Sequence, residues 1–338
     1  MDSGTVIFKS KLLICFFSVI SLLNICVYAQ APATQQAGSN WPNRPIKVVV
    51  PALTGGPDTL IRVLSPYLAA GLGQPIVVDN KPGASAVIGT DYVAKSVPDG
   101  YTFMADSSGF VVKPGIVKKL PYDTEKDFIP IINMASNMGL MLIVHPSHPA
   151  KNLGEFIAMG KKPETNFSYS SPGVGNTLHL LGELFLNQAG IKMTHVPYKG
   201  GAPAATAVVA GEVTTMLAPI QVSNGFLKAG KLRALAYTLG ERTPFFPDVP
   251  TFKELGMTDF VTEGGWFGVF APAGTAPAIT NRMHAELKKA LTLPEVREKL
   301  YGLGFLVVAE SQEHFRNYFY AEIKKYAEIA KKSNIQAE

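Results

Sequence analysis

Short β-branched runs and longer amphipathic runs alternate along most of the chain. The apolar runs at 46–50, 75–79 and 101–105 predict strands, because strands are short and rich in β-branched residues. The runs at 59–70 and 86–95 have helical periodicity and lie between these strands. This β-α-β-α-β order predicts an α/β fold with a mostly parallel sheet covered by helices.

The same alternation starts again after a buried strand expected at 140–144. Helices are expected at 153–160, 177–189 and 203–210, and strands at 167–170, 193–196, 213–217 and 232–238. The C-terminal part predicts strands at 266–271 and 305–308, and helices at 276–291, 294–301 and from 311 onward. Strand-like crossings near 142 and 266 predict two doubly wound lobes. The first holds 41–142 and 266–338, and the second, 143–265, is inserted into it.

The first thirty residues have the pattern of a secretory signal peptide. Lys9 and Lys11 precede an apolar run at 12–27, and Ala29 ends a small-residue cleavage site. The run is shorter than the roughly twenty residues of a membrane span, so an uncleaved anchor is the weaker alternative. We expect a signal peptide at 1–29, cleaved near Ala29, and a flexible leader at 30–40.

Composition narrows the possible functions. Both cysteines, Cys15 and Cys26, lie in the predicted signal peptide, so the stability of the mature protein is expected to come from its core. The net charge is only +5, and the basic residues are dispersed without interleaved aromatic residues. A nucleic-acid partner is therefore not expected.

Signatures of catalysis, metals and cofactors are mostly missing from the sequence. The six histidines do not have the spacing of metal ligands, and there is no Gly-x-Ser-x-Gly motif. The glycines at 173 and 175 lack the third glycine of a dinucleotide turn, which is Leu178 here. We expect no metal, no cofactor and no catalytic residue. Ser107 and Ser108, which follow a strand, leave an exported serine hydrolase open as an alternative.

Two glycine-rich loops carry the strongest functional signal. The loops at 170–177 and 198–203 each lead from a predicted strand into a predicted helix. Glycines allow the backbone to approach a ligand closely, and the first N–H groups of a helix have no partner within it. The helix dipole also favours a negative group at this end. These loops predict a site for a small anion.

Further turns are expected at the same edges of the two sheets. The first lobe supplies loops at 53–56, 82–85 and 107–108, and the second supplies 171–177, 198–201 and the turn at 218–221. Ligands of doubly wound sheets bind beyond the carboxyl ends of the strands, where these loops fall. For any single loop, glycine and serine in an ordinary turn remain the simpler interpretation. Together, the loops predict one anion site.

The same residues resemble those of the Bug-type (TctC-like) solute receptors associated with tripartite tricarboxylate transporters. The similar stretches run in order along nearly the whole mature chain: Arg44-Pro45-Ile46, Val78-Asp79-Asn80-Lys81-Pro82-Gly83-Ala84, Pro98-Asp99-Gly100-Tyr101-Thr102, Tyr169-Ser170-Ser171-Pro172-Gly173-Val174-Gly175, His195-Val196-Pro197-Tyr198-Lys199-Gly200 and Pro247-Asp248-Val249-Pro250-Thr251. Each stretch is modest by itself, but the ordered set is specific.

The resemblance implies a type II periplasmic binding protein. Such a protein has two lobes around a ligand cleft, joined by a two-strand hinge, and it presents a small organic carboxylate to membrane transporter subunits. A sensor protein is the alternative partner. By the same resemblance the ligand contacts are Leu53, Thr54, Gly55, Gly56, Ser85, Ala86, Ser107, Ser108, Ser171, Gly173, Gly175, Asn176, Thr177, Tyr198, Lys199, Gly200 and Ala218. Whether Lys199 faces the cleft stays open.

The chain departs from the family pattern at positions that bear on the ligand. Relatives often have aspartate near Ala207 and Ala218, and its loss argues against an amino group on the ligand. Apolar Leu53, Ala218 and Ile220 favour an aromatic or otherwise less polar acid instead.

Overall fold

The computed structural model describes residues 41–333. The predicted signal peptide and leader, 1–29 and 30–40, lie outside the described residues. Within the part that is described, no helix has both the length and the hydrophobicity needed to cross a membrane.

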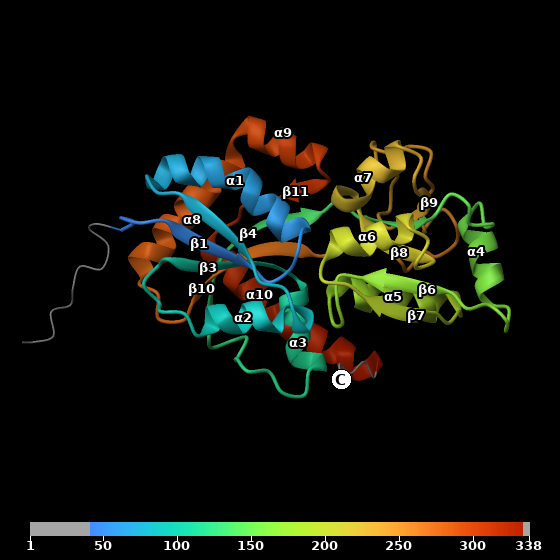
Figure 1. Ribbon diagram of the computed structural model, residues 1–338, viewed down its shortest axis with the longest axis horizontal. Helices are drawn as coiled ribbons and strands as arrows, with labels where there is room; N and C mark the ends of the chain where they lie inside the picture. Colours follow the sequence, from blue (N-terminus) through green and yellow to red (C-terminus); the bar gives the residue numbers. More distant parts are fainter. Residues whose placement is uncertain (1–40, 334–338) are drawn as a thin grey trace, which may run out of the picture. The chain divides into compact units, whose positions relative to one another are not determined.

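The first sheet has six strands in the order β11-β4-β10-β3-β1-β2 (Figure 1). These are β1 (Ile46–Val50), β2 (Ile76–Asn80), β3 (Thr102–Ser107), β4 (Phe128–Asn137), β10 (Trp266–Pro272) and β11 (Phe305–Val307). Strand β1 is parallel to β2 and β3, whereas β10 is antiparallel to β3 and β4. The sheet is therefore parallel only in part. Strand β10 begins beside the carboxyl ends of β3 and β4 and runs in the opposite direction to both.

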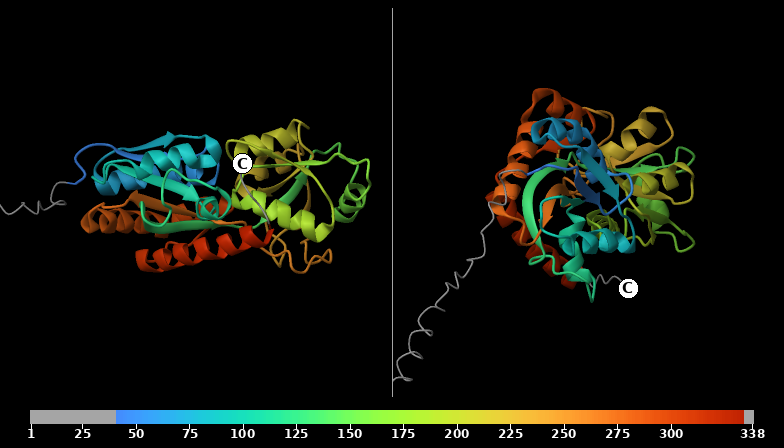
Figure 2. Two further views of the ribbon diagram at one scale, coloured as in Figure 1. Left: turned by 90° about the horizontal axis from the view of Figure 1, so that it is seen from below. Right: turned by 60° about the vertical axis from the view of Figure 1, so that its left-hand side comes forward.

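Helices cover both faces of this sheet. They are α1 (Gly56–Leu72), α2 (Val87–Ala94), α3 (Gly109–Ile116), α8 (Pro277–Thr292), α9 (Pro294–Gly302) and α10 (Gln312–Ser333), with the short 3-10 turn η2 (Ala84–Ala86) before α2. Helices α1, α8 and α9 lie on one face, and α2, α3 and α10 lie on the other (Figure 2). Val48 and Val50 of β1 pack with the first group, whereas Val49 packs with the second. Burial on both faces explains why the strand is apolar throughout.

The second sheet has five strands in the order β7-β6-β8-β5-β9 (Figure 1). These are β5 (Leu140–Val144), β6 (Ser168–Ser171), β7 (Thr194–Pro197), β8 (Thr215–Pro219) and β9 (Arg233–Tyr237). Its helices are α4 (Leu153–Gly160), α5 (Thr177–Ala189), α6 (Gly201–Val209) and α7 (Ile220–Lys228). Strand β6 is parallel to β7 and β8, and β5 is antiparallel to β8 and β9.

Two adjacent crossings connect the sheets. The chain leaves the first sheet between β4 and β5 and returns just before β10. The crossings are hydrogen-bonded to each other, since Asn137 donates its N–H to the Gly265 carbonyl at 2.9 Å and Gly139 to the Glu263 carbonyl at 3.1 Å. The predicted fold class, two doubly wound lobes joined by a two-strand hinge, is confirmed.

Three elements escaped the sequence pattern. Strand β4 contains Pro130 and buried polar residues, including Asn133, so its periodicity is masked. Helix α3 contains Pro114, which is unusual inside a helix. Helix α7 is continuous, but its sequence contains Ser223-Asn224-Gly225, which is typical of a turn. Most other elements match their predicted ranges within one or two residues. Helix α1 begins earlier than predicted, at Gly56, because Pro57 suits the first turn of a helix.

Candidate functional site

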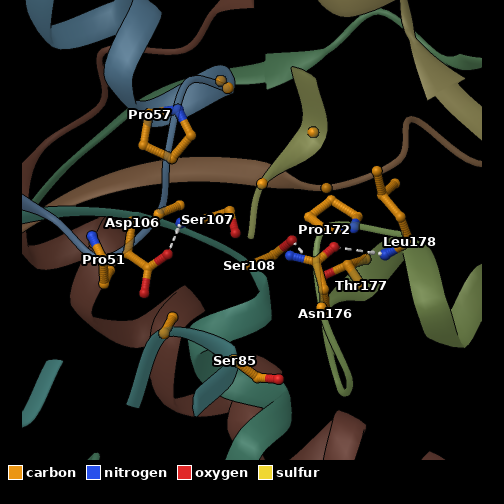
Figure 3. Close-up of a pocket in the computed structure, with 18 of the residues that line it drawn as sticks. Pro51, Pro57, Ser85, Asp106, Ser107, Ser108, Pro172, Asn176, Thr177 and Leu178 are labelled. Atoms are coloured by element: carbon orange, nitrogen blue, oxygen red, sulfur yellow. Dashed lines mark hydrogen bonds between the residues drawn. The ribbon is translucent and has the colours of Figure 1, made fainter. Parts of the chain in front are cut away.

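One pocket gathers loops from the carboxyl ends of strands in both sheets (Figure 3). Its cavity volume is about 270 Å³, near the lower end of the range for small-molecule sites. The loops that follow β1, β2 and β3 meet those that follow β6, β7 and β8, and the two crossings contribute Asn137, Gly264 and Gly265. Prolines such as Pro51, Pro57 and Pro172 have no N–H to donate and form apolar parts of the wall.

Most of the residues predicted to contact a ligand line this pocket. They are Gly55, Gly56, Ser85, Ala86, Ser107, Ser108, Gly173, Asn176, Thr177, Tyr198, Lys199 and Gly200. The other five, Leu53, Thr54, Ser171, Gly175 and Ala218, lie outside the lining. The structure therefore brings predicted residues from five separate loops to one cavity.

The five residues outside the lining have other roles in the structure. The Leu53 N–H donates to the Lys199 carbonyl at 2.9 Å, and the Thr54 carbonyl accepts from Ala202 at 3.3 Å. These bonds tie the loop after β1 to the loop after β7. Gly175 has φ +70°, and a side chain there would collide with Ile116. The position thus favours glycine for structural reasons, whatever the ligand.

The residues that favoured a less polar ligand do not face the cavity. Ala218 is fully buried within β8, opposite Met141 of β5. Ile220, also fully buried, and Leu53 are absent from the lining too. The interpretation that favoured an aromatic acid therefore has no support from the pocket wall.

Helices α1 and α6 begin side by side at the pocket, and neither has a side-chain cap among the described residues. In the described chain, no side chain accepts a hydrogen bond at the start of α1 or of α6, and Gly55 and Gly200 occupy the two N-cap positions. A side-chain carbon on Gly55 would lie 3.5 Å from the Gly201 nitrogen, so the two helix starts are neighbours. Their first N–H groups have no carbonyl partner within their own helices, and both dipoles favour a negative guest.

Helix α5 begins differently, because its own N-cap residue satisfies it. The Asn176 side chain accepts a hydrogen bond from the Leu178 N–H at 2.9 Å (Figure 3). The Gly175 N–H donates to Nδ1 of His179 at 3.1 Å. The loop before α5 is thus held by its own side chains, and fewer of its N–H groups are open to a ligand.

Two stacked histidines, His179 and His195, pack against the loop before α5. The rings of His179 and His195 lie 4.0 Å apart and nearly parallel, and Nε2 of His195 is 2.7 Å from the Ser171 hydroxyl. Burial lowers the pKa of His195 to about 3, helped by the neighbouring His179, whose own pKa is lowered by burial. Both rings are therefore neutral near pH 7. Tyr169, which stacks on His195, donates a hydrogen bond to Glu183.

Side chains also meet across the pocket between the two sheets. The hydroxyls of Ser108 and Thr177 are 2.7 Å apart (Figure 3). The Gln221 side-chain amide donates to Oδ1 of Asn137 at 2.7 Å. A side-chain carbon on Gly173 would lie 3.4 Å from the Ser85 hydroxyl. The two sides of the pocket are in direct contact in this conformation.

The turn before α2 has three residues with positive φ that the sequence does not predict. Ala84, Ser85 and Ala86 have φ values of 44°, 51° and 78°, a region that residues other than glycine rarely adopt. The Ala86 carbonyl accepts a hydrogen bond from the Thr90 hydroxyl at 2.9 Å, which helps to hold the turn. Such strain costs on the order of 1 kcal/mol per residue and often occurs at ligand sites.

Sequence reasoning missed two buried charges in the wall. Asp106 at the end of β3 and Lys113 of α3 are only 5% and 4% exposed, and both line the pocket. Burial raises the pKa of Asp106 and lowers that of Lys113, and each opposes the other's shift through its charge. Single charged residues that follow the apolar runs 103–105 and 110–112 were the available signal.

The described residues contain no group of three or more histidine, cysteine or acidic side chains arranged to hold a metal ion. The chemistry that the pocket offers is hydrogen bonding from main-chain N–H groups and hydroxyls, with one buried carboxylate and one buried ammonium group.

Solved structures define the class of protein. The chain has a TM-score of 0.82 to the periplasmic binding protein BugD, at 30% identity over 88% of this chain and 100% of BugD. It has a TM-score of 0.80 to MatC from Rhodopseudomonas palustris with bound malate, at 31% identity over 86% and 99% of the two chains. For the R. palustris protein Rpa4515 with adipate, the TM-score is 0.82, at 32% identity over 88% and 99%. The fold is that of a periplasmic binding protein.

The sequence comparisons identify the family. Residues 60–335 match the model of the tripartite tricarboxylate transporter family receptor. Protein BugT from Bordetella pertussis is 32% identical over 93% of this chain and 97% of its own length. The chain belongs to this family of solute-binding receptors, and the resemblance to the Bug-type proteins is confirmed.

Proposed function

We propose that the protein is a periplasmic receptor that binds a small organic carboxylate between its two lobes and delivers it to a tripartite tricarboxylate-type membrane transporter. The observation that carries this proposal is the pair of uncapped helix starts, α1 and α6, side by side in one pocket. Their N–H groups and dipoles suit a carboxylate without a buried counter-charge.

The solved relatives support the ligand class. MatC was solved with malate and Rpa4515 with adipate, and both of these ligands are small carboxylic acids. We propose that the contacts in this chain come from the predicted residues that line the pocket, with the starts of α1 and α6 holding a carboxylate. The Lys199 side chain is exposed at the rim, and its part in binding is left to experiment.

Hinge movement is the proposed route of ligand entry and release. The sequence predicts one lobe of 41–142 and 266–338 and a second of 143–265. Because β5 (Leu140–Val144) pairs with β8 and β9 of the second sheet, we propose that the first boundary lies just before Leu140. Opening at the crossings breaks the Ser108–Thr177 and Leu53–Lys199 contacts, and binding restores them. The protein is proposed to be exported and its signal peptide cleaved near Ala29.

A thermal-shift screen of carboxylates on the mature protein, followed by calorimetric titration, tests the proposal. A ligand at one hundred times its dissociation constant stabilises the folded state by about 2.7 kcal/mol. That raises the melting temperature by roughly 5 °C in a chain of this size. A broad panel of mono-, di- and tricarboxylates that gives no shift and no binding heat contradicts the proposal.

Two alternatives from the sequence have their own tests. Deleting a transport receptor abolishes uptake of the ligand, whereas deleting a sensor leaves uptake intact and abolishes only induction. A serine hydrolase needs a base beside its nucleophile, but the Ser108 hydroxyl is engaged with Thr177. Turnover of esters or amides by the purified protein, lost on Ser107→Ala or Ser108→Ala, would establish the hydrolase instead.

A further inference from the structure

The wall of the pocket formed by β3 and α3 contains an incomplete hydrogen-bonding arrangement. Oδ1 of Asp106 accepts a hydrogen bond from the Ser107 N–H at 2.7 Å. Oδ2 of Asp106 is buried and has no hydrogen-bond partner among the described residues. In Figure 3 this carboxylate extends from the end of β3 toward the side of the pocket that carries Ser85. A buried carboxylate oxygen without a donor is unfavourable, so the site is complete only with an added donor.

The neighbouring ammonium group also has unused hydrogen-bonding capacity. Nζ of Lys113 donates to the Gly109 carbonyl at 3.1 Å, which uses one of its three N–H bonds. Helix α3 starts directly after β3, and Lys113 in this helix lies close enough to Asp106 for their charges to interact. Their charges influence each other, yet no ion pair of 4.0 Å or less joins them in the described chain. Both residues line the same cavity.

We propose that Asp106 and Lys113 determine ligand specificity by binding a hydroxyl group, so that the ligand is a hydroxycarboxylate. This rests on the proposed function, because the carboxylate of the same ligand binds at the helix starts. A hydroxyl group is both donor and acceptor. It donates to Oδ2 of Asp106, which gives that oxygen its donor, and accepts a second hydrogen bond from Nζ of Lys113.

Other substituents at this place make fewer favourable contacts with Asp106 and Lys113. A methylene group offers neither a donor nor an acceptor. A keto oxygen accepts from Lys113 but leaves the Asp106 oxygen without a donor. An ammonium group donates to Asp106 but brings a second positive charge toward Lys113. The predicted order of affinity is therefore hydroxy acid above keto, unsubstituted and amino acid of the same carbon skeleton.

The test compares matched acids by calorimetric titration of the mature protein. Three sets cover different lengths: propionate, lactate, pyruvate and alanine; succinate, malate, oxaloacetate and aspartate; and glutarate, 2-hydroxyglutarate, 2-oxoglutarate and glutamate. In each set that binds, we expect the hydroxy acid to bind at least about tenfold more tightly than the unsubstituted acid. A site built to hydrogen-bond a hydroxyl group can reject the analogue that lacks it by about 10⁴-fold, so tenfold is the smallest ratio that supports the proposal.

Substitutions link the preference to these two residues. Asp106→Asn keeps the oxygen that accepts from Ser107 and places an N–H₂ donor where Oδ2 was, so the preference should move from the hydroxy acid to the keto acid. The double variant Asp106→Asn/Lys113→Met removes both charges together and should bring the hydroxy-to-unsubstituted ratio close to one. Asp99→Asn is the matched control, since Asp99 pairs with Arg44 near the other end of β3 and should leave the ratio unchanged.

The outcomes separate this inference from the proposed function. If carboxylates bind but the hydroxy and unsubstituted acids bind equally, the specificity inference is wrong and the receptor function stands. Tighter binding of the amino acid, or an unchanged ratio in a folded Asp106→Asn protein, also overturns it. If no carboxylate binds, the proposed function fails and this inference fails with it.

Discussion

The loops before α5 and α6 look alike in the sequence, but they differ in the structure. Each is a glycine-rich turn between a strand and a helix. Before α5, the Asn176 side chain caps the helix, His179 accepts from Gly175, and Ile116 fills the space beside that glycine. Before α6 no side chain of the described chain caps the helix. The first loop is a braced wall of the pocket. The second has no side-chain cap among the residues described, and although the Ala202 N–H donates to the Thr54 carbonyl, the Gly201 N–H is available to a ligand.

The largest effect on binding is expected where the open helix start is covered. Gly201 has room for a side chain, since a carbon there would meet only Val222 at an ordinary 3.5 Å. Gly201→Val should therefore fold normally, cover the start of α6, and weaken carboxylate binding about 100-fold, equivalent to about 2.7 kcal/mol. Gly225→Val is the matched control, because it adds the same side chain in α7 where nothing lies within 4 Å. Normal binding by Gly201→Val would show that α6 does not hold the carboxylate.

Substitution in the loop before α5 should lower the stability of the protein. Gly175→Ala combines a positive φ with a collision against Ile116, and we expect a loss of about 2–4 kcal/mol in the free energy of unfolding. Gly73→Ala has nearly the same φ, +71°, and open space around it, so it should lose only about 1 kcal/mol. Chemical denaturation of both variants measures the difference. Equal losses would mean that Ile116 does not brace the loop.

A smaller effect is expected from acid. The pKa of His195 is lowered to about 3 in the folded state, and its unfolded value is about 6.5. Between these values the unfolded chain binds more protons, so this contribution is complete above about pH 6.5 and is lost as the pH falls toward 3. Allowing for partial exposure, we expect a loss of about 1 kcal/mol between pH 7 and 5. His195→Gln should flatten that part of the melting-temperature profile, and an equally steep profile would assign the loss elsewhere.

An effect on stability as small as that of acid is expected at the cap of α5. Asn176→Ala should lower stability by about 1 kcal/mol, because the Leu178 N–H loses its partner. Asn152→Ala removes the same kind of cap from α4, which does not contribute to the pocket, and should cost a similar amount. Calorimetric titration should show altered ligand affinity only in Asn176→Ala. Equal affinities in the two variants would place Asn176 among purely structural residues.

Much of the fold was predictable because local chemistry specifies it. Strand β5 and helices α4 and α5 have the predicted bounds, since their apolar periodicity is regular and their ends carry clear signals. Strand β4 was missed because it buries polar residues between the sheet and its covering helices. Its partners come from distant parts of the chain, so no local pattern marks it.

The site was predictable to the level of loops, but not to the level of individual atoms. Glycine and serine turns after strands indicated which segments meet, and most of the named residues line the pocket. Leu53 and Ala218 were predicted to line the pocket because they follow strands in the sequence. In the structure the Leu53 N–H bonds to the loop after β7, and Ala218 lies inside β8.

The linear order of residues is sufficient to set the alternation of strands and helices and the positions of the glycine turns, because those depend on neighbours within a few residues. Two features depend on contacts between residues far apart in the chain. One is the pairing of the open starts of α1 and α6, and the other is the burial of Asp106 and Lys113 beside the cavity. Packing decides which N–H donors stay free and which charged side chains are removed from water. These two results give the pocket the chemistry that we propose binds a carboxylate.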